Sequence, residues 1–442
     1  MKVLLITSSA RGHAIAEAFA RSPQKPEIIA ASPSRNPGIR KLAAQQEVFD
    51  IMDFDRALEL AKNSKPDFAF VGPDDPIGAG LADALEGIGV PTVAPKKSLA
   101  RIESSKGFTR DLLNKHKIDA NPLFRVFRSS QGSDMSTFID QDLGGNFVIK
   151  YDALLGGKGV KVSGEHVHST EEGVAYALEC IEQCGQVVIE EKLVGVEFSL
   201  LSFVSGDSIV DMPAVQDHKR AFVGDEGPNT GGMGTYSDAN HSLPFVSDAE
   251  LKRASEINRL TAQALSEECE ESFVGILYGG FIIVKDGVRL IEYNARFGDP
   301  EALNILPLLS SDLVTICQGM LDGTLSNEMV TFDKKATVCK YITPESYPTS
   351  KDQRGEVVSF PTIPENARLY FGDISEDEDG TLRLGGSRTA GIVGIADTIS
   401  EAESIAQSLC EQVKGNVRFR QDIGKKELID QRSNTLKQLR SS

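Results

Sequence analysis

The sequence predicts an α/β and α+β chain of about three domains, which we place at residues 1–104, 105–326 and 327–442. The chain has 442 residues, more than one domain of ordinary size. Short apolar runs alternate with helical patterns over the first 104 residues, as in a parallel sheet with helices on both faces. Beyond them, strand patterns meet at turns such as 285–287, which indicates antiparallel hairpins.

The N-terminal domain has apolar runs that fit buried parallel strands, at residues 3–6, 28–31, 68–71 and 91–94. Ligands of such sheets bind beyond the carboxyl ends of the strands, where two loops lie. The loop 8–13, followed by a predicted helix near 14–21, has one glycine and therefore lacks a dinucleotide fingerprint. A hydroxyl-rich turn that opens a helix can still hold one phosphate, although simple capping explains it equally well. The second loop offers the candidate substrate contacts Gly72, Pro73 and Asp74.

Composition excludes several classes of protein. The formal net charge of −17 argues against nucleic acid or an anionic membrane as the main partner, because both demand a basic face. A small phosphate-bearing substrate needs only a local basic pocket. No apolar run reaches transmembrane length, and the first residues are too few for a signal peptide. The six cysteines form no C-x-x-C pair, so we expect reduced thiols in a cytoplasmic monomer.

A new unit is predicted after residue 121, where a strand at 147–150 ends in Lys150. The Gly-Gly-Lys-Gly turn that follows contains Gly157 and Lys158, and its backbone N–H groups can reach a phosphate. It is not a Walker A loop, because no helix and no Ser or Thr follow in register. Glycine hairpins are common, so this turn alone is a weak signal.

The segment 187–197 is predicted to connect two domains. Its apolar run ends in Glu190 and Glu191, and a long strand begins near residue 195. A short connector with free backbone N–H and C=O groups suits the edge of an adenine ring, and Glu197 just beyond it could hold ribose hydroxyls. An acidic surface hairpin is the alternative interpretation, and it is the better one if the segment is taken alone.

A long polar loop at 213–236 is either functional or disordered, because it contains so little apolar surface. Its chemistry-capable side chains are Asp217, Lys219 and Asn229, followed by Thr230 and Gly231 in a glycine-rich stretch. We interpret the single histidine of this loop, at position 218, as a hydrogen-bonded loop residue and not as a base.

The stretch 288–301 carries the strongest chemical pattern. Alternation predicts a strand in which Val288, Leu290, Glu292 and Asn294 share one face, and Arg296 joins them if the strand continues. Carboxylate and amide oxygens suit Mg²⁺, and arginine forks onto phosphate or carboxylate oxygens. A helix is predicted directly afterwards, with Asp299 as N-cap, Pro300 at its first position and Glu301 in its first turn. The run therefore predicts a metal–triphosphate site; the alternative is an edge strand with a solvated polar end.

The last domain shows no catalytic constellation in its sequence. Strands are predicted at 336–342 and in a hairpin with its tip at 375–380, and helices near 401–413 and over the tail after residue 424.

The chain closely resembles the phosphoribosylamine–glycine ligase family from Met1 to about Leu428. The resemblance rests on motifs in the same order along the chain, namely Lys106, Lys150, Glu190-Glu191, Gly227–Tyr236 and Asn294–Glu301. The resemblance implies an ATP-grasp fold whose lid, at about 122–191, closes over ATP. The chain departs from the family at Ser9–His13, where Gly-Gly-Arg-Glu-His is usual. It also has Gly280 where some members carry a glutamine that binds metal.

The resemblance also implies roles for single residues. Lys106 and Lys150 would contact ATP phosphates, Glu191 and Leu193 would offer backbone to adenine, and Glu197 would hold ribose. Glu292 and Asn294 would bind Mg²⁺ (or Mn²⁺). We assign catalysis to Arg296, Asp217 and Lys219, nucleotide contacts also to Gly157, Lys158 and Glu190, and substrate contacts to Gly72, Pro73, Asp74, Asn229, Thr230, Gly231, Asp299 and Glu301.

The implied reaction transfers the γ-phosphoryl group of ATP to glycine, and the amine of phosphoribosylamine then displaces phosphate. Catalysis would consist of positioning and charge neutralisation. Another ATP-grasp ligase with a different acid or amine is the nearest alternative. A nucleotide-binding module without activity and a dehydrogenase are the others, and the missing Gly-x-Gly-x-x-Gly turn disfavours the last.

Overall fold

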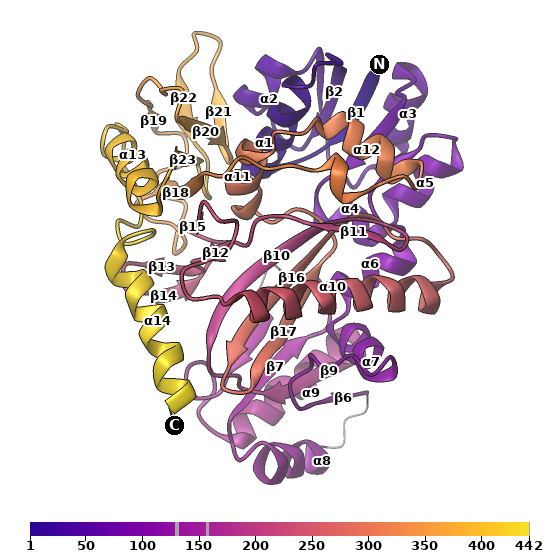
Figure 1. The fold of residues 1–442 in the computed structure, drawn as a ribbon, viewed down its shortest axis with the longest axis vertical. Coiled ribbons are helices and arrows are strands. Elements are labelled where there is room, and N and C mark those ends of the chain that lie inside the picture. The colour runs from indigo at the N-terminus through magenta and orange to yellow at the C-terminus, as the bar shows by residue number, and fades with distance from the viewer. Residues whose placement is uncertain (129–131, 156–158, 442) are drawn as a thin grey trace.

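The computed structural model describes residues 1–128, 132–155 and 159–441 (Figure 1). The predicted parallel sheet is confirmed: its five strands run in the order β3 (Gln45–Val48), β2 (Glu27–Ser32), β1 (Lys2–Ile6), β4 (Phe68–Val71) and β5 (Thr92–Val93). The helices of this region are α1 (Ser9–Ala20), α2 (Pro37–Leu42), α3 (Phe54–Ser64), α4 (Asp74–Ala79), α5 (Leu81–Gly87) and α6 (Lys97–Ser104).

A small antiparallel sheet lies at the opposite end of the molecule (Figure 1). Its order is β6 (Phe124–Phe127), β9 (Val187–Glu191), β7 (Phe147–Tyr151) and β8 (Val160–Val162). The helices α8 (Gly132–Thr137) and α9 (Thr170–Cys184), with a π-helical turn at Phe138–Asp142, cover one face. Phe138, Phe147 and Ile189 belong to a core cluster confined to this unit, so the small sheet has its own hydrophobic support.

The central sheet is antiparallel, in the order β11 (Ser208–Asp211), β10 (Val196–Ser205), β16 (Val274–Val284) and β17 (Gly287–Asn294). The helices α7 (Lys106–Lys115) and α10 (Asp248–Cys269) pack against it. A capping box at Ser247 and Glu250 starts α10. After β17 come α11 (Glu301–Ile305), α12 (Leu313–Leu321) and 3₁₀ turns at Leu306–Leu308 and Asn327–Met329.

The third large sheet combines the polar loop with the C-terminal segment. Its order is β12 (Gln216–Asp217), β15 (Gly234–Ser237), β18 (Ala336–Pro344), β23 (Ala390–Ala396) and β20 (Ala367–Phe371), and β24 (Val417–Arg418) also pairs with β18. The remaining elements are the hairpin β13 (Arg220–Phe222) and β14 (Glu226–Asn229), the sheet of β19 (Val357–Val358), β22 (Leu382–Leu384) and β21 (Ile374–Glu376), and the helices α13 (Ile399–Glu411) and α14 (Lys426–Ser441). The polar loop is therefore ordered, and strand pairing fixes it.

Two further expectations can be compared with the structure. All six cysteines lie in the described part of the chain and are free thiols. Among the described residues, no helix is both long enough and apolar enough to cross a bilayer.

His13 joins the N-terminal domain to the C-terminal sheet. Its Nδ1 accepts a hydrogen bond from the Phe371 backbone N–H at 2.9 Å, and its ring lies edge-on to Tyr370. Burial, with a smaller effect of Lys41, lowers the pKa of His13 to about 4. The ring is therefore neutral in the folded protein at pH 7.

We expect His13 to make the protein less stable in mild acid. Between about pH 6.5 and 4 the unfolded chain binds a proton at this ring and the folded chain does not, so stability falls as pH falls through that window. From pH 7 to pH 5 the loss is about 2 kcal/mol. Over this range the thermal midpoint of His13→Gln should fall less than that of the wild type. His168→Gln, at an exposed position, should behave like the wild type; equal falls in all three proteins would contradict the assignment.

Candidate active site

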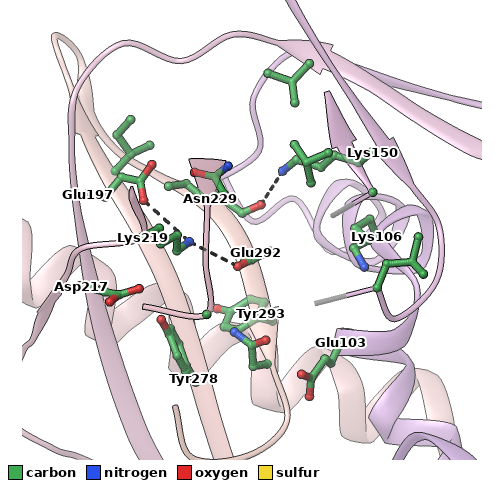
Figure 2. A pocket seen from close by; sticks show the side chains of 18 of the residues that line it. Glu103, Lys106, Lys150, Glu197, Asp217, Lys219, Asn229, Tyr278, Glu292 and Tyr293 are labelled. Carbon is green, nitrogen blue, oxygen red and sulfur yellow. Dashed lines mark hydrogen bonds and ion pairs between the residues drawn. The ribbon is translucent and has the colours of Figure 1, made fainter. Parts of the chain in front are cut away.

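A cavity of about 730 Å³ opens where the N-terminal domain, the small sheet, the central sheet and the polar loop meet. Figure 2 shows Lys106 and Lys150 on one wall, Glu197, Asp217 and Lys219 on the other, and Glu292 between them. The predicted residues that line the cavity are Asp74, Lys106, Lys150, Glu190, Glu191, Leu193, Glu197, Asp217, Lys219, Asn229, Thr230, Gly231, Glu292, Asn294, Arg296, Asp299 and Glu301.

Four predicted residues are not among them. Gly72 and Pro73 belong to the described chain but do not line the cavity; the N–H of Gly72 donates to the Ile6 carbonyl and continues the β1–β4 edge. Gly157 and Lys158 lie outside the described residues.

A β-bulge presents the two predicted metal ligands. Gly280 lies opposite Glu292 and Phe281 lies opposite Leu290, so Ile291 is the extra residue. The prediction of one shared face is therefore wrong: Val288 and Leu290 pack in the core, whereas Glu292 and Asn294 line the cavity. Tyr293 belongs to the core cluster and also borders the cavity. The bulge shifts the two-residue alternation by one position, which turns the carboxylate and the amide toward the cavity.

Glu292 is ionised in this setting. Burial opposes its charge, but Lys219, Lys150 and Lys106 outweigh burial and lower the pKa of Glu292 to about 2. The Lys219 ammonium lies 3.6 Å from Glu292 and 3.9 Å from Glu197. The Glu292 side chain remains 34 % exposed, so its oxygens are accessible from the cavity.

Arg296 lies just past the end of β17 and is held by carboxylates. Its Nη2 lies 2.9 Å from Glu103 and 3.9 Å from Asp74, and donates to the Asn294 amide oxygen at 3.1 Å. Glu103 also accepts the Ala295 backbone N–H at 2.7 Å. Burial acts against the guanidinium charge, but Glu103 and Asp74 outweigh it and raise the pKa of Arg296. Its Nε finds no hydrogen-bond partner among the described residues.

Lys150 and Glu190 form a buried ion pair at 2.5 Å. Burial disfavours the charge on Glu190, yet Arg110 and Lys150 together lower its pKa. Lys150 also donates to the Ile291 carbonyl at 2.8 Å, and Lys106 donates to the Ala153 carbonyl at 2.7 Å. Both lysines predicted to bind phosphate are therefore anchored to backbone oxygens at the cavity wall.

The carboxylates Asp217 and Glu301 meet on the far side of the cavity. Glu301 is almost fully buried and accepts a hydrogen bond from the Tyr278 hydroxyl at 2.6 Å. Burial, followed by the Glu301 charge, raises the pKa of Asp217 well above its ordinary value, and Lys219 only partly offsets this. A positively charged group of a substrate would relieve both carboxylates.

Asp299 does not cap a helix, which contradicts the prediction. The helix α11 begins at Glu301 with Pro300 as its N-cap residue, after a cis peptide bond between Asp299 and Pro300. The Asp299 carboxylate instead accepts hydrogen bonds from Ser9 at 2.6 Å and Tyr341 at 2.5 Å. These tertiary partners take the side chain away from the helix N-terminus.

The turn predicted at 8–13 is mostly helical, because α1 begins at Ser9. The Arg11 backbone N–H donates to Asp299 at 3.1 Å, and its side chain donates to the Phe297 carbonyl at 2.6 Å. Ser8, Ser9 and Arg11 line the cavity. The start of α1 is thus fixed to the segment that follows β17.

The polar loop at 213–236 forms another wall of the cavity. Thr230 bonds to the Lys219 carbonyl through its N–H and its hydroxyl, at 2.7 and 2.8 Å. His218 is buried, with Nδ1 3.1 Å from the Gly234 carbonyl, and burial lowers its pKa to about 4. The interpretation of His218 as a hydrogen-bonded loop residue is confirmed.

Sequence reasoning missed three residues of the site. Glu103 and Arg110 lie on the helices α6 and α7. Their partners, Arg296 and Glu190, are distant in sequence, so the helical pattern does not reveal them. Arg388 comes from the C-terminal segment and reaches the Gly231 carbonyl at 2.8 Å and the Asp299 carbonyl at 2.9 Å. The glycine-flanked run 385–391 around Arg388 was the one available signal in the sequence.

Family models match most of the chain. They are the phosphoribosylglycinamide synthetase N domain at residues 1–103, ATP-grasp (A) domain at 104–302 and C domain at 337–426.

Related proteins that align over nearly the whole chain agree with this match. The chain is 44 % identical to the phosphoribosylamine–glycine ligase of Methanococcus vannielii, over 99 % of this chain and 100 % of the relative. It is 43 % identical to that of Methanosarcina barkeri over the full length of both. The crystal structure of the Thermotoga maritima phosphoribosylamine–glycine ligase superposes with a TM-score of 0.79 and 26 % identity, over 96 % of this chain and 100 % of that one. A biotin carboxylase from Campylobacter jejuni, with a TM-score of 0.75 and 12 % identity over 99 % and 98 % of the two chains, shares the fold alone.

Proposed function

The chain belongs to the phosphoribosylglycinamide synthetase family, and we propose that the cavity around Glu292, Asn294 and Arg296 is where it activates glycine. The protein is an ATP-dependent ligase of purine biosynthesis, which joins glycine to phosphoribosylamine and forms ADP and phosphate. The observation that carries the site assignment is the convergence of two oxygen ligands and several cations from separate elements on one cavity.

The nucleotide is assigned to the side of the cavity between the small and central sheets. Lys106 and Lys150 would contact its phosphates, joined by Gly157 and Lys158. The end of β9, with Glu190 and Glu191, and the connector after it, with Leu193, would hold the adenine edge, and Glu197 would hold the ribose. This assignment is supported by the described residues among them, all of which line the cavity at the junction of the two sheets. Gly157 and Lys158 lie outside the described residues.

As an ATP-grasp enzyme, the protein uses ATP with a divalent metal ion. We assign Mg²⁺ to Glu292 and Asn294, because a carboxylate and an amide oxygen plus phosphate oxygens are the ligands it favours. Its bound charge would offset that of the triphosphate. Among the described residues there is no cluster of three or more His, Cys, Asp or Glu suited to a metal, which supports a site completed by the nucleotide.

The chemistry is supported by the charges that face the cavity. A carboxylate oxygen of glycine forms a bond to the γ-phosphorus, and the bond from that phosphorus to the β-bridging oxygen breaks, releasing ADP. The amine nitrogen of phosphoribosylamine then bonds to the acyl carbon, and phosphate leaves with the electron pair of the anhydride bond. Arg296 and Lys219 would stabilise the developing negative charge. The nitrogen must lose a proton, which Asp217 could accept.

Substrate contacts are assigned to the wall opposite the nucleotide. Glu301 with Asp217 would hold the ammonium group of glycine, and Asp74, Asn229, Thr230, Gly231 and Asp299 would border phosphoribosylamine. Gly72 and Pro73 would support this wall from behind.

The domain limits 1–104, 105–326 and 327–442, with a lid at about 122–191, remain a proposal, as do a monomeric state and a cytoplasmic location without nucleic acid or membrane partners. The six free thiols support a reducing compartment.

An ADP-release assay with each substrate omitted in turn tests the function. We expect full turnover only with ATP, Mg²⁺, glycine and phosphoribosylamine together. Full turnover with another amino acid in place of glycine would point to a different ATP-grasp ligase, and tight ATP binding without turnover would point to a nucleotide-binding module.

A further inference from the structure

Arg110 is buried where three elements meet. It projects from α7, its side chain is 2 % exposed, and it donates to Glu190 on β9 at 2.8 and 3.2 Å. It also donates to the Leu290 and Ile291 carbonyls of β17, at 3.1 and 2.8 Å. One guanidinium thus connects the small sheet to the bulge that presents Glu292.

Glu190 has two cationic partners. Arg110 binds it in a fork through both carboxylate oxygens, and Lys150 lies 2.5 Å from one of them. The Glu190 side chain is only 5 % exposed, so the loss of a partner would leave its charge poorly solvated. One cation is sufficient to neutralise the carboxylate, and the second is therefore available for another task.

Lys150 is the cation that can leave. It lines the cavity, and in the proposed function its ammonium contacts the triphosphate. Its ammonium has three N–H donors, of which Glu190 and the Ile291 carbonyl take two, so a bound phosphate would compete with Glu190 for the same positive charge. Removing the partner of a buried carboxylate is strongly unfavourable. With Arg110 in place, Glu190 keeps a bidentate partner when Lys150 moves.

We propose that Arg110 is a positioning residue that keeps Glu190 neutralised, and so allows Lys150 to transfer from Glu190 to the phosphates of ATP. This inference rests on the proposed nucleotide position. It assigns to Arg110 an effect on ATP affinity that acts through Glu190 and not through any contact with ATP.

A double-mutant cycle on MgATP binding, measured by calorimetry on the full chain, tests the proposal. In the native background, Arg110→Met should weaken ATP binding by about 100-fold, because Lys150 would then be the only partner of a buried carboxylate. In a Glu190→Gln background there is no carboxylate to neutralise, so Arg110→Met should change the affinity by less than about threefold.

Several controls separate the possible failures. Arg259→Met removes an arginine that is ion-paired to Glu256 on the exposed side of α10, and it should bind ATP like the wild type. If Arg110→Met does not fold, Arg110→Gln, which keeps hydrogen-bonding groups but carries no charge, gives the same comparison when it is measured in both backgrounds. Equal weakening in both backgrounds would mean that Arg110 only supports packing, and would overturn the inference.

Two further outcomes would overturn the inference, the first leaving the proposed ligase function intact and the second removing the proposed nucleotide site as well. If Lys150→Met binds ATP as tightly as the wild type, Lys150 has no role at the triphosphate and the inference fails, although the ligase function stands. If the wild-type protein binds no ATP, the proposed nucleotide site fails and the inference fails with it.

Discussion

Replacing Glu292 with alanine is expected to lower the rate of glycine-dependent ADP release by about 10²–10³. Glu292 is the one carboxylate that the Ile291 bulge turns into the cavity, and Lys219 faces it at 3.6 Å. Without it, the metal ion would lose its charged protein ligand, and the Lys219 charge would lose a neighbour. Turnover should be measured over a range of Mg²⁺ concentrations, because part of the loss should be recovered at high Mg²⁺.

Glu256→Ala is the matched control for this variant. It removes an exposed carboxylate of α10 that pairs only with Arg259 in the described contacts, and it should leave turnover unchanged. If Glu292→Ala retained wild-type turnover at every Mg²⁺ concentration, the metal assignment would be wrong.

Replacing Arg296 with alanine is expected to lower kcat by a similar factor of about 10²–10³. Glu103 and Asp74 hold its guanidinium beside Asn294, and its Nε has no partner in the described part of the chain. Arg296 lines the cavity, so its positive charge can stabilise oxygens that gain negative charge during phosphoryl transfer. Arg296→Lys should recover only part of the rate, because lysine keeps the charge but not the planar fork.

The separate measurement of kcat and KM identifies what Arg296 does. A loss in kcat with little change in the KM of ATP indicates stabilisation of the transition state, whereas a rise in KM alone would indicate simple substrate binding. Arg289→Ala, on the same strand but outside the cavity lining, should match the wild type. A wild-type kcat in Arg296→Ala would remove this residue from the catalytic set.

Local patterns predicted the secondary structure near the site because short-range physics determines it. The parallel sheet and the hairpin that joins β16 to β17 follow from apolar periodicity and a tight turn. Glu292 and Asn294 were predicted to lie together because both belong to one strand, two residues apart, and in the structure both line the cavity.

Tertiary partners account for what was missed. From Val288 to Asn294 the alternation is interrupted by the apolar pair Leu290-Ile291, but this pair alone does not identify a bulge. The pairing with Gly280 and Phe281 shows that Ile291 is the extra residue. The capping preference of Asp299 was overridden by Ser9 and Tyr341, which are distant in sequence. Contacts of this kind cannot be read from residue spacing.

The isotopic composition of the released phosphate tests the central claim most directly. With glycine labelled with ¹⁸O in its carboxylate, ATP, Mg²⁺ and phosphoribosylamine, one ¹⁸O atom should appear in each phosphate released, because a glycine oxygen bonds to the γ-phosphorus before the amine displaces it. Phosphate free of ¹⁸O, formed together with the amide product, would contradict activation of glycine as an acyl phosphate.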